Sequence, residues 1–391
     1  MTIKTTPLFY LGSLSAFALI TFDLYQPALP VIVKEFNASY ALGQLTFSLY
    51  LFVFGLAQLF WGPIVDHFGR NKALATSLSI FFMATLACIF ATNIYMLICA
   101  RAIQAFSACC ASIVSISSTR DCEDSTERAR IISYISMIVS ASPVFAPLIG
   151  SLMLIYFSWQ ADFVLMLLFA VYLFVCSRFF LYESPFFEYE TKTLKIGSWL
   201  KVYKTILTHK KLWIAIINLT GGFTMLMIFI VNAAYLLMEK LHFSPLMFAI
   251  LFGINGSTII IGNYAGIKLR EKYSLIWNIK LGSKLLALGA VLMCLFYLFF
   301  GLHLITLAPA VLISFSTNFT IAPVIALLLA DYNQNTATVT ALMNTTRMSL
   351  SAVFAGLVGT LLVSNLVFLP ISLLIFSIIC LISGHLFKEN P

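Results

Sequence analysis

The sequence predicts an all-α integral membrane protein with twelve transmembrane helices. Of its 391 residues, 61% are hydrophobic and only 10% are charged, whereas an ordinary soluble domain has about 25% charged residues. A helix needs about 20 apolar residues to cross a hydrocarbon layer about 30 Å thick. Twelve such helices joined by short loops account for the length of the chain.

The apolar runs form two sets of six. The first six lie near residues 8–33, 42–63, 73–91, 94–117, 132–156 and 162–181. The second six lie near residues 212–237, 244–266, 277–300, 304–328, 336–362 and 366–387. We therefore predict an N-terminal six-helix bundle over residues 1–182, a cytoplasmic linker over 183–210 and a C-terminal six-helix bundle over 211–391.

Lysine and arginine predict the orientation of the spans. With the N-terminus inside, Lys34 and Lys240 fall in outer loops, and Arg101 and Arg347 fall within spans. The other 19 of the 23 basic residues lie on the cytoplasmic side, as the positive-inside rule requires. We predict a multi-pass protein of the inner membrane with both termini in the cytoplasm. The net charge of +8 is then a topology signal, and we expect no nucleic-acid partner because no basic soluble domain is available.

Motifs of catalysis and nucleotide binding are missing from the sequence. It contains no Gly-x4-Gly-Lys-Ser/Thr loop, no His-Glu-x-x-His and no Gly-x-Ser-x-Gly, which are patterns of ATPases, zinc proteases and serine hydrolases. We expect no enzyme activity, no cofactor and no metal. Energy for any transport would then come from an ion gradient or a concentration gradient.

Asp23 is the only acidic residue that we place deep within an apolar run, and Pro27 and Pro30 follow it in the same run. A charged side chain at the bilayer centre costs roughly 2.5 to 3.5 kcal/mol on insertion scales, so it must face protein or water. We predict that Asp23 is the proton site of a transporter. The alternative is a fixed buried ion pair that joins spans one and four.

The segment from Gly62 to Lys72 reads Gly-Pro-Ile-Val-Asp-His-Phe-Gly-Arg-Asn-Lys. It closely resembles the signature loop of the major facilitator superfamily, Gly-x-x-x-Asp-x-x-Gly-Arg-x-Lys. The resemblance implies two six-helix bundles around a central site, with Gly69 in the loop between spans two and three. It also implies that Asp66 lies at a helix end and pairs with Arg70, forming a latch of the outward-facing state. The alternative is an ordinary loop with cytoplasmic arginines.

Two stretches resemble the twelve-span drug:proton antiporters, in particular the Bcr/CflA-like exporters. The first is Asp23-x-x-x-Pro27-x-x-Pro30. The second, residues 142–151, is similar to the antiporter motif Gly-x-x-x-Gly-Pro-x-x-Gly-Gly, with three glycines replaced by Ser142, Ala146 and Ser151. Small residues still permit close approach of helices. The resemblance implies that a helix bend and close packing come from Pro143, Pro147 and Gly150.

Span four contains Arg101-Ala-Ile-Gln104-Ala105, which is similar to the Arg-x-x-Gln-Gly pattern of the superfamily. At the start of span six, the expected aromatic-Arg pair is Trp159-Gln160 instead. Asp23 lies roughly 15 Å and Arg101 roughly 10 Å from the outer ends of their spans, so the two can meet if the helices pack side by side.

We predict that Asp23 exchanges a proton with the outside and that its charged form pairs with Arg101 or Gln104. Substrate binding would displace the proton. Gln26 follows at i+3 on the same helix face and is predicted to share the site, whereas Tyr25 is assigned to packing.

Arg347 lies roughly 16 Å deep in span eleven. Together with Arg101 it gives two deep cations against Asp23, a balance that favours anionic, zwitterionic or neutral substrates. The alternative for Arg347 is a helix-end arginine that snorkels to the surface. Further predicted substrate contacts are Asn232, Tyr235 and Asn255, with hydrogen bonding between helices as the alternative.

We therefore predict proton-coupled export of a small organic molecule, a drug or an amphiphilic metabolite, by alternating access, as in multidrug efflux. The expected partners are the lipid bilayer, protons and a small-molecule substrate, and the expected state is a monomer. Alternatives are export of a carboxylate-bearing metabolite or siderophore, and proton-coupled uptake by symport. From a different class, the chain could be a non-transporting membrane receptor or assembly subunit.

Overall fold

The computed structural model of the chain describes residues 6–122, 124–183, 208–329 and 336–387. Within these ranges the regular structure is helical, and twelve stretches are long and apolar enough to cross a membrane. They match the predicted spans in number. In the first half they are formed by α1 (Leu8–Asp23) with η1 (Gln26–Ala28) and α2 (Leu29–Glu35), α3 (Tyr40–Phe68), α4 (Arg70–Ile89), α5 (Ile94–Ser118) with η2 (Thr119–Asp121), α6 (Ser125–Tyr156) and α7 (Gln160–Phe180).

The remaining six spans follow in the second half of the chain. They are formed by α9 (Lys210–Ala234) with the π-helical turn η3 (Tyr235–Lys240), α10 (Pro245–Arg270), α11 (Leu275–Phe300), α12 (Leu304–Leu307) with α13 (Pro309–Leu329), α14 (Thr336–Ser364) and α15 (Phe368–Leu386).

The chain divides into two compact units. Unit 1 comprises Met1–Leu194 with Pro245–Gly253, and unit 2 comprises Lys195–Ser244 with Ile254–Pro391. Most of the predicted linker, residues 183–210, lies outside the described residues. The predicted boundaries at residues 182 and 211 therefore stay predictions.

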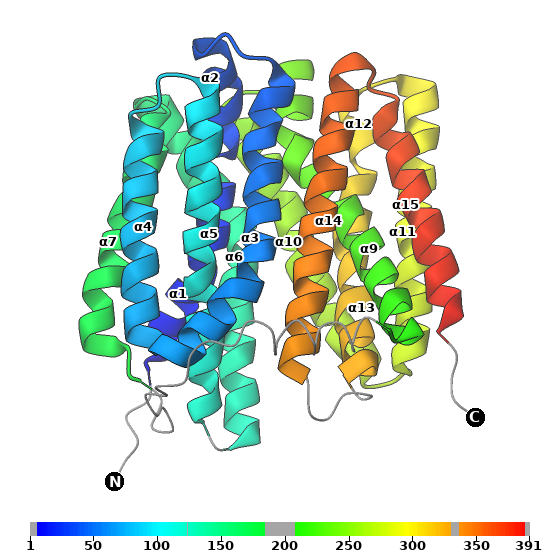
Figure 1. Cartoon of the computed structure of the whole chain (residues 1–391). Helices are drawn as coiled ribbons and strands as arrows, with labels where there is room; N and C mark the ends of the chain where they lie inside the picture. The colour runs from blue at the N-terminus through cyan, green and yellow to red at the C-terminus, as the bar shows by residue number, and fades with distance from the viewer. Residues whose placement is uncertain (1–5, 123, 184–207, 330–335, 388–391) are drawn as a thin grey trace. The chain divides into compact units, whose positions relative to one another are not determined.

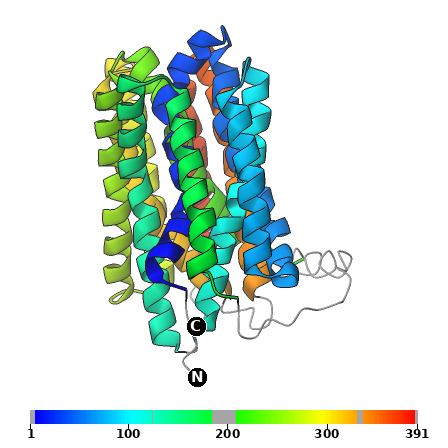
Figure 2. The ribbon, with the colours of Figure 1, turned by 90° about the vertical axis from the view of Figure 1, so that its left-hand side faces the viewer.

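In unit 1, α5 packs against α1, α3 and α4, while α7 covers α4 and touches α1. Figure 1 shows these helices running side by side, and in Figure 2 the green helix α7 lies on the face turned to the viewer. In unit 2, α9 packs against α13, α14 and α15, and α11 packs against α13 and α15. Helices α5 and α9 thus each pack against three other helices of their unit.

The first span is broken beside its carboxylate. Helix α1 ends at Asp23, and the chain passes through η1 before α2 begins at Leu29. Pro27 and Pro30 each stand in the first turn of the segment that follows the break. Proline lacks the N–H that a helix interior needs, and it disfavours helical geometry in the preceding residue. The two prolines therefore place Asp23 at a helix end inside an apolar segment.

Helix α6 approaches this break closely at Gly150. A Cβ atom at Gly150 would collide with the carbonyl oxygen of Leu24 and come within 3.2 Å of the Pro27 ring. The predicted close packing at Gly150 is therefore seen in unit 1. Pro143 and Pro147 lie within α6, which continues through both as one helix.

Replacing Gly150 by alanine is expected to destabilise the protein by about 1–3 kcal/mol, because the added methyl group overpacks a backbone contact. The free energy of unfolding in detergent measures this change. Gly62→Ala is the matched control, since nothing lies within 4 Å of a Cβ atom there. Equal stability of the two variants would contradict the close contact between α6 and the break.

Candidate functional site

The Asp23 carboxylate is buried and bound by two neutral donors. Gln26 Nε2 donates to Asp23 Oδ1 at 3.1 Å, and Ser142 Oγ of α6 donates to Asp23 Oδ2 at 3.1 Å. The exposed fraction of Asp23 is 4%. The predicted proximity of Gln26 is seen, whereas Ser142 was known from the sequence only as a substitute for a motif glycine. No formal positive charge is among these recorded partners.

Arg101 on α5 is fully buried and faces aromatic rings. Its guanidinium carbon lies 4.3 Å from the centre of the Tyr50 ring and 4.8 Å from that of Tyr25. Its Nη1 donates to Gln104 Oε1 at 2.8 Å and to the Thr21 carbonyl oxygen at 3.3 Å. Cation–π contact strengthens when the groups are desolvated. Tyr25, assigned to packing, therefore packs against the buried cation itself.

The predicted pairing of Asp23 with Arg101 or Gln104 differs from the contacts observed among the described residues. Asp23 is bound by Gln26 and Ser142 instead, while Gln104 bridges Arg101 and Thr85 Oγ1, the latter at 2.7 Å. Each buried charge thus has one partner three residues along its own segment, Gln26 or Gln104, and one from another span, Ser142 or Thr21. A pairing in another conformation stays a prediction.

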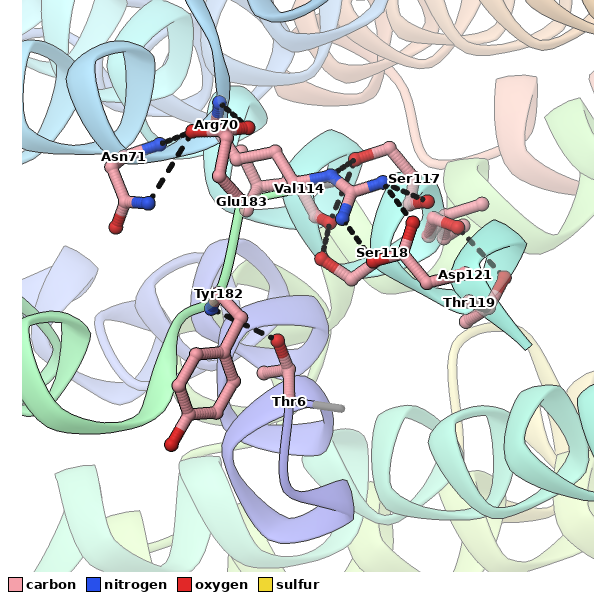
Figure 3. A network of polar contacts seen from close by, with 11 residues as sticks. Thr6, Arg70, Asn71, Val114, Ser117, Ser118, Thr119, Asp121, Tyr182 and Glu183 are labelled. Atoms are coloured by element: carbon pink, nitrogen blue, oxygen red, sulfur yellow. Dashed lines mark hydrogen bonds and ion pairs between the residues drawn. The ribbon is translucent and has the colours of Figure 1, made fainter. Parts of the chain in front are cut away.

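The signature loop holds a different ion pair from the predicted one. Arg70, the first residue of α4, forms an ion pair with Asp121 at the end of η2, and its Nη2 donates to Asp121 Oδ1 at 3.0 Å. Its Nε donates to Ser117 Oγ at 3.2 Å. Figure 3 shows this network. Asp66 lies near the end of α3, as predicted, but is exposed, so the acid that binds Arg70 is Asp121 rather than Asp66.

Glu183 caps the start of α4 in the same network (Figure 3). The backbone N–H groups of Arg70 and Asn71 donate to the Glu183 carboxylate at 2.9 and 3.2 Å. The first N–H groups of a helix lack partners within the helix and favour a negative charge. Gly69 has a φ of +84°, and a Cβ atom there would lie 2.8 Å from Glu183 Oε2. Glycine thus fits both the conformation and the space, while Lys72 is exposed.

In unit 2, Arg347 of α14 is partly buried against α9. Its guanidinium carbon lies 4.5 Å from the centre of the Phe223 ring, and Nη2 donates to Asn344 Oδ1 at 3.3 Å. Its Nε has no hydrogen-bond partner among the described residues. Arg347 therefore retains a buried donor, which distinguishes it from an arginine that only snorkels to the surface.

The predicted polar contacts of unit 2 join helices. Asn232 Nδ2 donates to the Ile228 carbonyl oxygen at 2.8 Å and to that of Ala355 in α14 at 3.5 Å. Asn255 Oδ1 of α10 accepts from Ser314 Oγ of α13 at 2.9 Å. These bonds fit the alternative of hydrogen bonding between helices.

Tyr235 begins the turn η3 and is buried, with Lys240 Nζ 5.3 Å from its ring centre. Single π-helical turns of this kind are frequent at functional sites. Among the described residues, no group of three or more His, Cys, Asp or Glu side chains is arranged to hold a metal.

Asp162 is a second buried acid that the sequence analysis missed. It is 0% exposed, and both carboxylate oxygens lack a hydrogen-bond partner among the described residues. It is the first residue of the predicted span 162–181, a position from which its burial could not be foreseen. Asp23 is therefore not the only buried acid within a predicted span.

Comparison with known proteins identifies relatives. The Major Facilitator Superfamily model matches residues 11–356. The uncharacterized MFS-type transporter YdgK of Bacillus subtilis is 28% identical over 263 residues, which cover 66% of this chain and 64% of YdgK. The multidrug resistance protein MdtL of Citrobacter koseri is 33% identical over 162 residues, 41% of this chain and 42% of MdtL. Both matches span less than two thirds of the relative's length.

Solved transporter structures share the fold. A bacterial homolog of the human lysosomal transporter Spinster, inward-facing and unoccupied, has a TM-score of 0.70 at 15% identity, covering 97% of this chain and 95% of that chain. A POT family transporter in complex with a thioalcohol conjugated peptide has a TM-score of 0.73 at 12% identity, covering 97% and 94%. The predicted fold class is confirmed.

Replacing Asp121 by asparagine is expected to destabilise the protein by about 3 kcal/mol, because it leaves the Arg70 guanidinium buried without its counter-charge. The free energy of unfolding in detergent measures the loss. Asp66→Asn is the matched control, since substitution of an exposed side chain usually changes stability by no more than about 0.5 kcal/mol. A larger loss of stability with Asp66→Asn than with Asp121→Asn would indicate that Arg70 pairs with Asp66, as predicted from the sequence.

Proposed function

The chain belongs to the Major Facilitator Superfamily of secondary transporters, and we propose that it exports a small organic molecule in exchange for protons. It is a multi-pass membrane protein and not an enzyme. As part of this proposal we place it in the inner membrane as a monomer. Both termini are proposed to lie in the cytoplasm, following the distribution of its basic residues.

The observation that carries the proposal is the setting of Asp23. Its carboxylate lies at a helix break in an apolar segment and is bound by Gln26 and Ser142, which are neutral. Neutral donors stabilise a carboxylate without fixing it in one charge state, as an arginine partner would. A protonated Asp23 leaves the same donors in place, so proton exchange requires no large rearrangement. Arg101 and Gln104 remain in our proposal as the neighbours that respond to this change.

The signature loop is the proposed conformational latch, formed by Gly62, Asp66, Gly69, Arg70 and Lys72. Buried Arg70 and its acid would hold α4 against the end of α5 in one state of the transporter. Arg70 and Asp121 belong to the same unit, so their ion pair would hold the loop in shape, and a contact that separates when the bundles rock is proposed for the exposed Asp66. Asp121 and Glu183 join this proposal on the contacts described above.

Substrate contacts are proposed for Gln26, Arg101, Gln104, Asn232, Tyr235, Asn255 and Arg347, with Asp23 as the site of competition with the proton. The partial similarity to MdtL supports a drug-like or amphiphilic substrate. The unsatisfied Nε of Arg347 favours a second candidate, a carboxylate-bearing metabolite or siderophore, because guanidinium binds carboxylate strongly. Uptake by symport and a non-transporting receptor or assembly role are outcomes that the experiment below separates.

The test is transport by purified protein in proteoliposomes under an imposed pH gradient. The panel contains tetraphenylphosphonium, chloramphenicol and citrate, which represent cationic, neutral and polycarboxylate compounds. We expect substrate and proton to move in opposite directions for at least one compound. Movement in the same direction would indicate symport, and no proton movement with any compound would contradict the proposal.

Asp23→Asn is expected to abolish proton-driven transport while leaving the protein folded, because asparagine keeps the size of the side chain and cannot exchange a proton. The initial rate of substrate transport in proteoliposomes under the imposed pH gradient measures this loss. Glu127→Gln, at an exposed acid, is the control and is expected to transport like the wild type. If the Asp23→Asn variant kept both the transport rate and its dependence on pH, Asp23 would not be the proton site.

Arg347→Gln is expected to weaken citrate binding about tenfold, or about 1.4 kcal/mol, and to leave chloramphenicol binding unchanged. Equilibrium binding to the purified protein measures both affinities. Arg347→Lys keeps the charge but not the planar fork, so it should recover part of the citrate affinity. Unchanged affinity for citrate in both variants would remove Arg347 from the binding site.

A further inference from the structure

The side chain of Asp162 has no place in the transport cycle proposed so far. It lies in the first turn of α7, is 0% exposed, and neither carboxylate oxygen has a partner among the described residues. Asp23, by contrast, has two donors. Asp23 and Asp162 therefore have opposite environments, one equipped to hold a negative charge and one not.

Aromatic residues surround this turn of α7. Phe163 packs against Tyr25, with ring centres 5.4 Å apart, and against Trp159, with ring centres 5.9 Å apart. Trp159 is 1% exposed, and its indole Nε1 donates to Glu35 Oε2 of α2 at 2.7 Å. The indole is thus held by a hydrogen bond at its Nε1 and by ring contact with Phe163. This packing keeps water from the turn that carries Asp162.

Charged and titratable groups stand near the same turn but do not bind it. Tyr25 lies within electrostatic range of Arg101, Cys88 and Asp162. Helix α7 packs against α4, α1 and α6. The titratable or charged groups at this end of the neighbouring elements are Asp23 and Tyr25 beside α1, Lys34 and Glu35 on α2, Cys88 on α4, Tyr95 and Arg101 on α5, and Tyr156 on α6. None of them is a hydrogen-bond partner of Asp162.

A carboxylate without hydrogen bonds or a counter-ion is the most costly form of this side chain in an apolar interior, and the neutral acid is far less costly. The geometry at residue 162 therefore requires the neutral, protonated form in the conformation described. Rewetting of the turn would reverse that preference. A change that moves Trp159 or Phe163 away from Asp162 would admit water and release the proton.

We propose that Asp162 is a second proton-carrying carboxyl of unit 1, which holds its proton in this conformation and releases it when the transport cycle opens the start of α7 to water. This inference rests on the proposed function. Asp23 exchanges its proton against the substrate, and Asp162 exchanges its proton with the conformational change. Because the start of α7 lies on the outer side in the predicted orientation, this proton returns to the outside, so Asp162 links the conformational change to external pH without adding to the protons moved per substrate.

Infrared spectroscopy of the purified protein tests the charge state without any substrate. We expect Asp162→Asn to remove intensity from the C=O stretching band of protonated carboxyls at neutral pH. Glu127→Gln, at an exposed acid, should remove intensity only from the carboxylate bands. Loss of carboxylate intensity alone in Asp162→Asn would overturn the inference.

A second measurement serves if Asp162→Asn does not fold. Dicyclohexylcarbodiimide reacts with protonated carboxyls in apolar surroundings, and mass spectrometry locates the modified residue in the wild-type protein. Modification of Asp162 at neutral pH supports the inference. Modification of Asp23 without modification of Asp162 overturns it.

The dependence of transport on external pH separates this inference from the proposed function. Proton movement and transport rate are measured in proteoliposomes with whichever compound of the panel the wild type transports. We expect proton movement to disappear in Asp23→Asn, whereas Asp162→Asn keeps proton movement and loses part of the dependence of the transport rate on external pH. A wild type that moves no protons with any compound refutes the proposed function. A coupled wild type whose transport rate depends on external pH in the same way in Asp162→Asn refutes only the role of Asp162.

Discussion

The cost of holding charge away from water governs the interior of this protein. Asp23, Arg101, Asp162 and Arg347 are buried or partly buried side chains of its membrane-spanning segments that can carry a charge, and their surroundings meet that cost in different ways. Asp23 accepts hydrogen bonds from two neutral groups, whereas Arg101 lies against aromatic faces and donates to an amide and a carbonyl oxygen. Arg347 lies against one ring, and both arginines keep donor atoms without a partner among the described residues. Asp162 has no partner, which only the neutral acid can tolerate.

Local backbone geometry makes the arrangement around Asp23 possible. The break after α1 frees a helix end, and the glycine at position 150 lets α6 approach it closely enough for Ser142 to reach the carboxylate. The same principle operates at the other end of the unit. There Gly69 takes a left-handed conformation that leaves room for Glu183 against the first amides of α4. Glycines thus leave the room in which charged groups reach their partners.

Much of the fold follows from the sequence, because twenty apolar residues have few stable arrangements in a membrane. The signature loop and the contact of Gln26 with Asp23 were also predictable, since both depend on residues close in sequence. Ser142 was not, because it comes from 119 positions away. The same limit explains why Asp121 was missed as the partner of Arg70. Asp162 was missed for another reason, since distance from a span end measures depth poorly when aromatic side chains cover the helix start.

The rings around Arg101 have a consequence for ligand selection. Tyr25 and Tyr50 present the kind of aromatic faces that attract organic cations, but a residue of the protein already occupies those faces. A cationic compound entering this part of unit 1 meets a competitor that is covalently attached and cannot diffuse away. The Arg101 guanidinium therefore competes with organic cations for these rings, and such ligands reach the rings only in conformations that displace it.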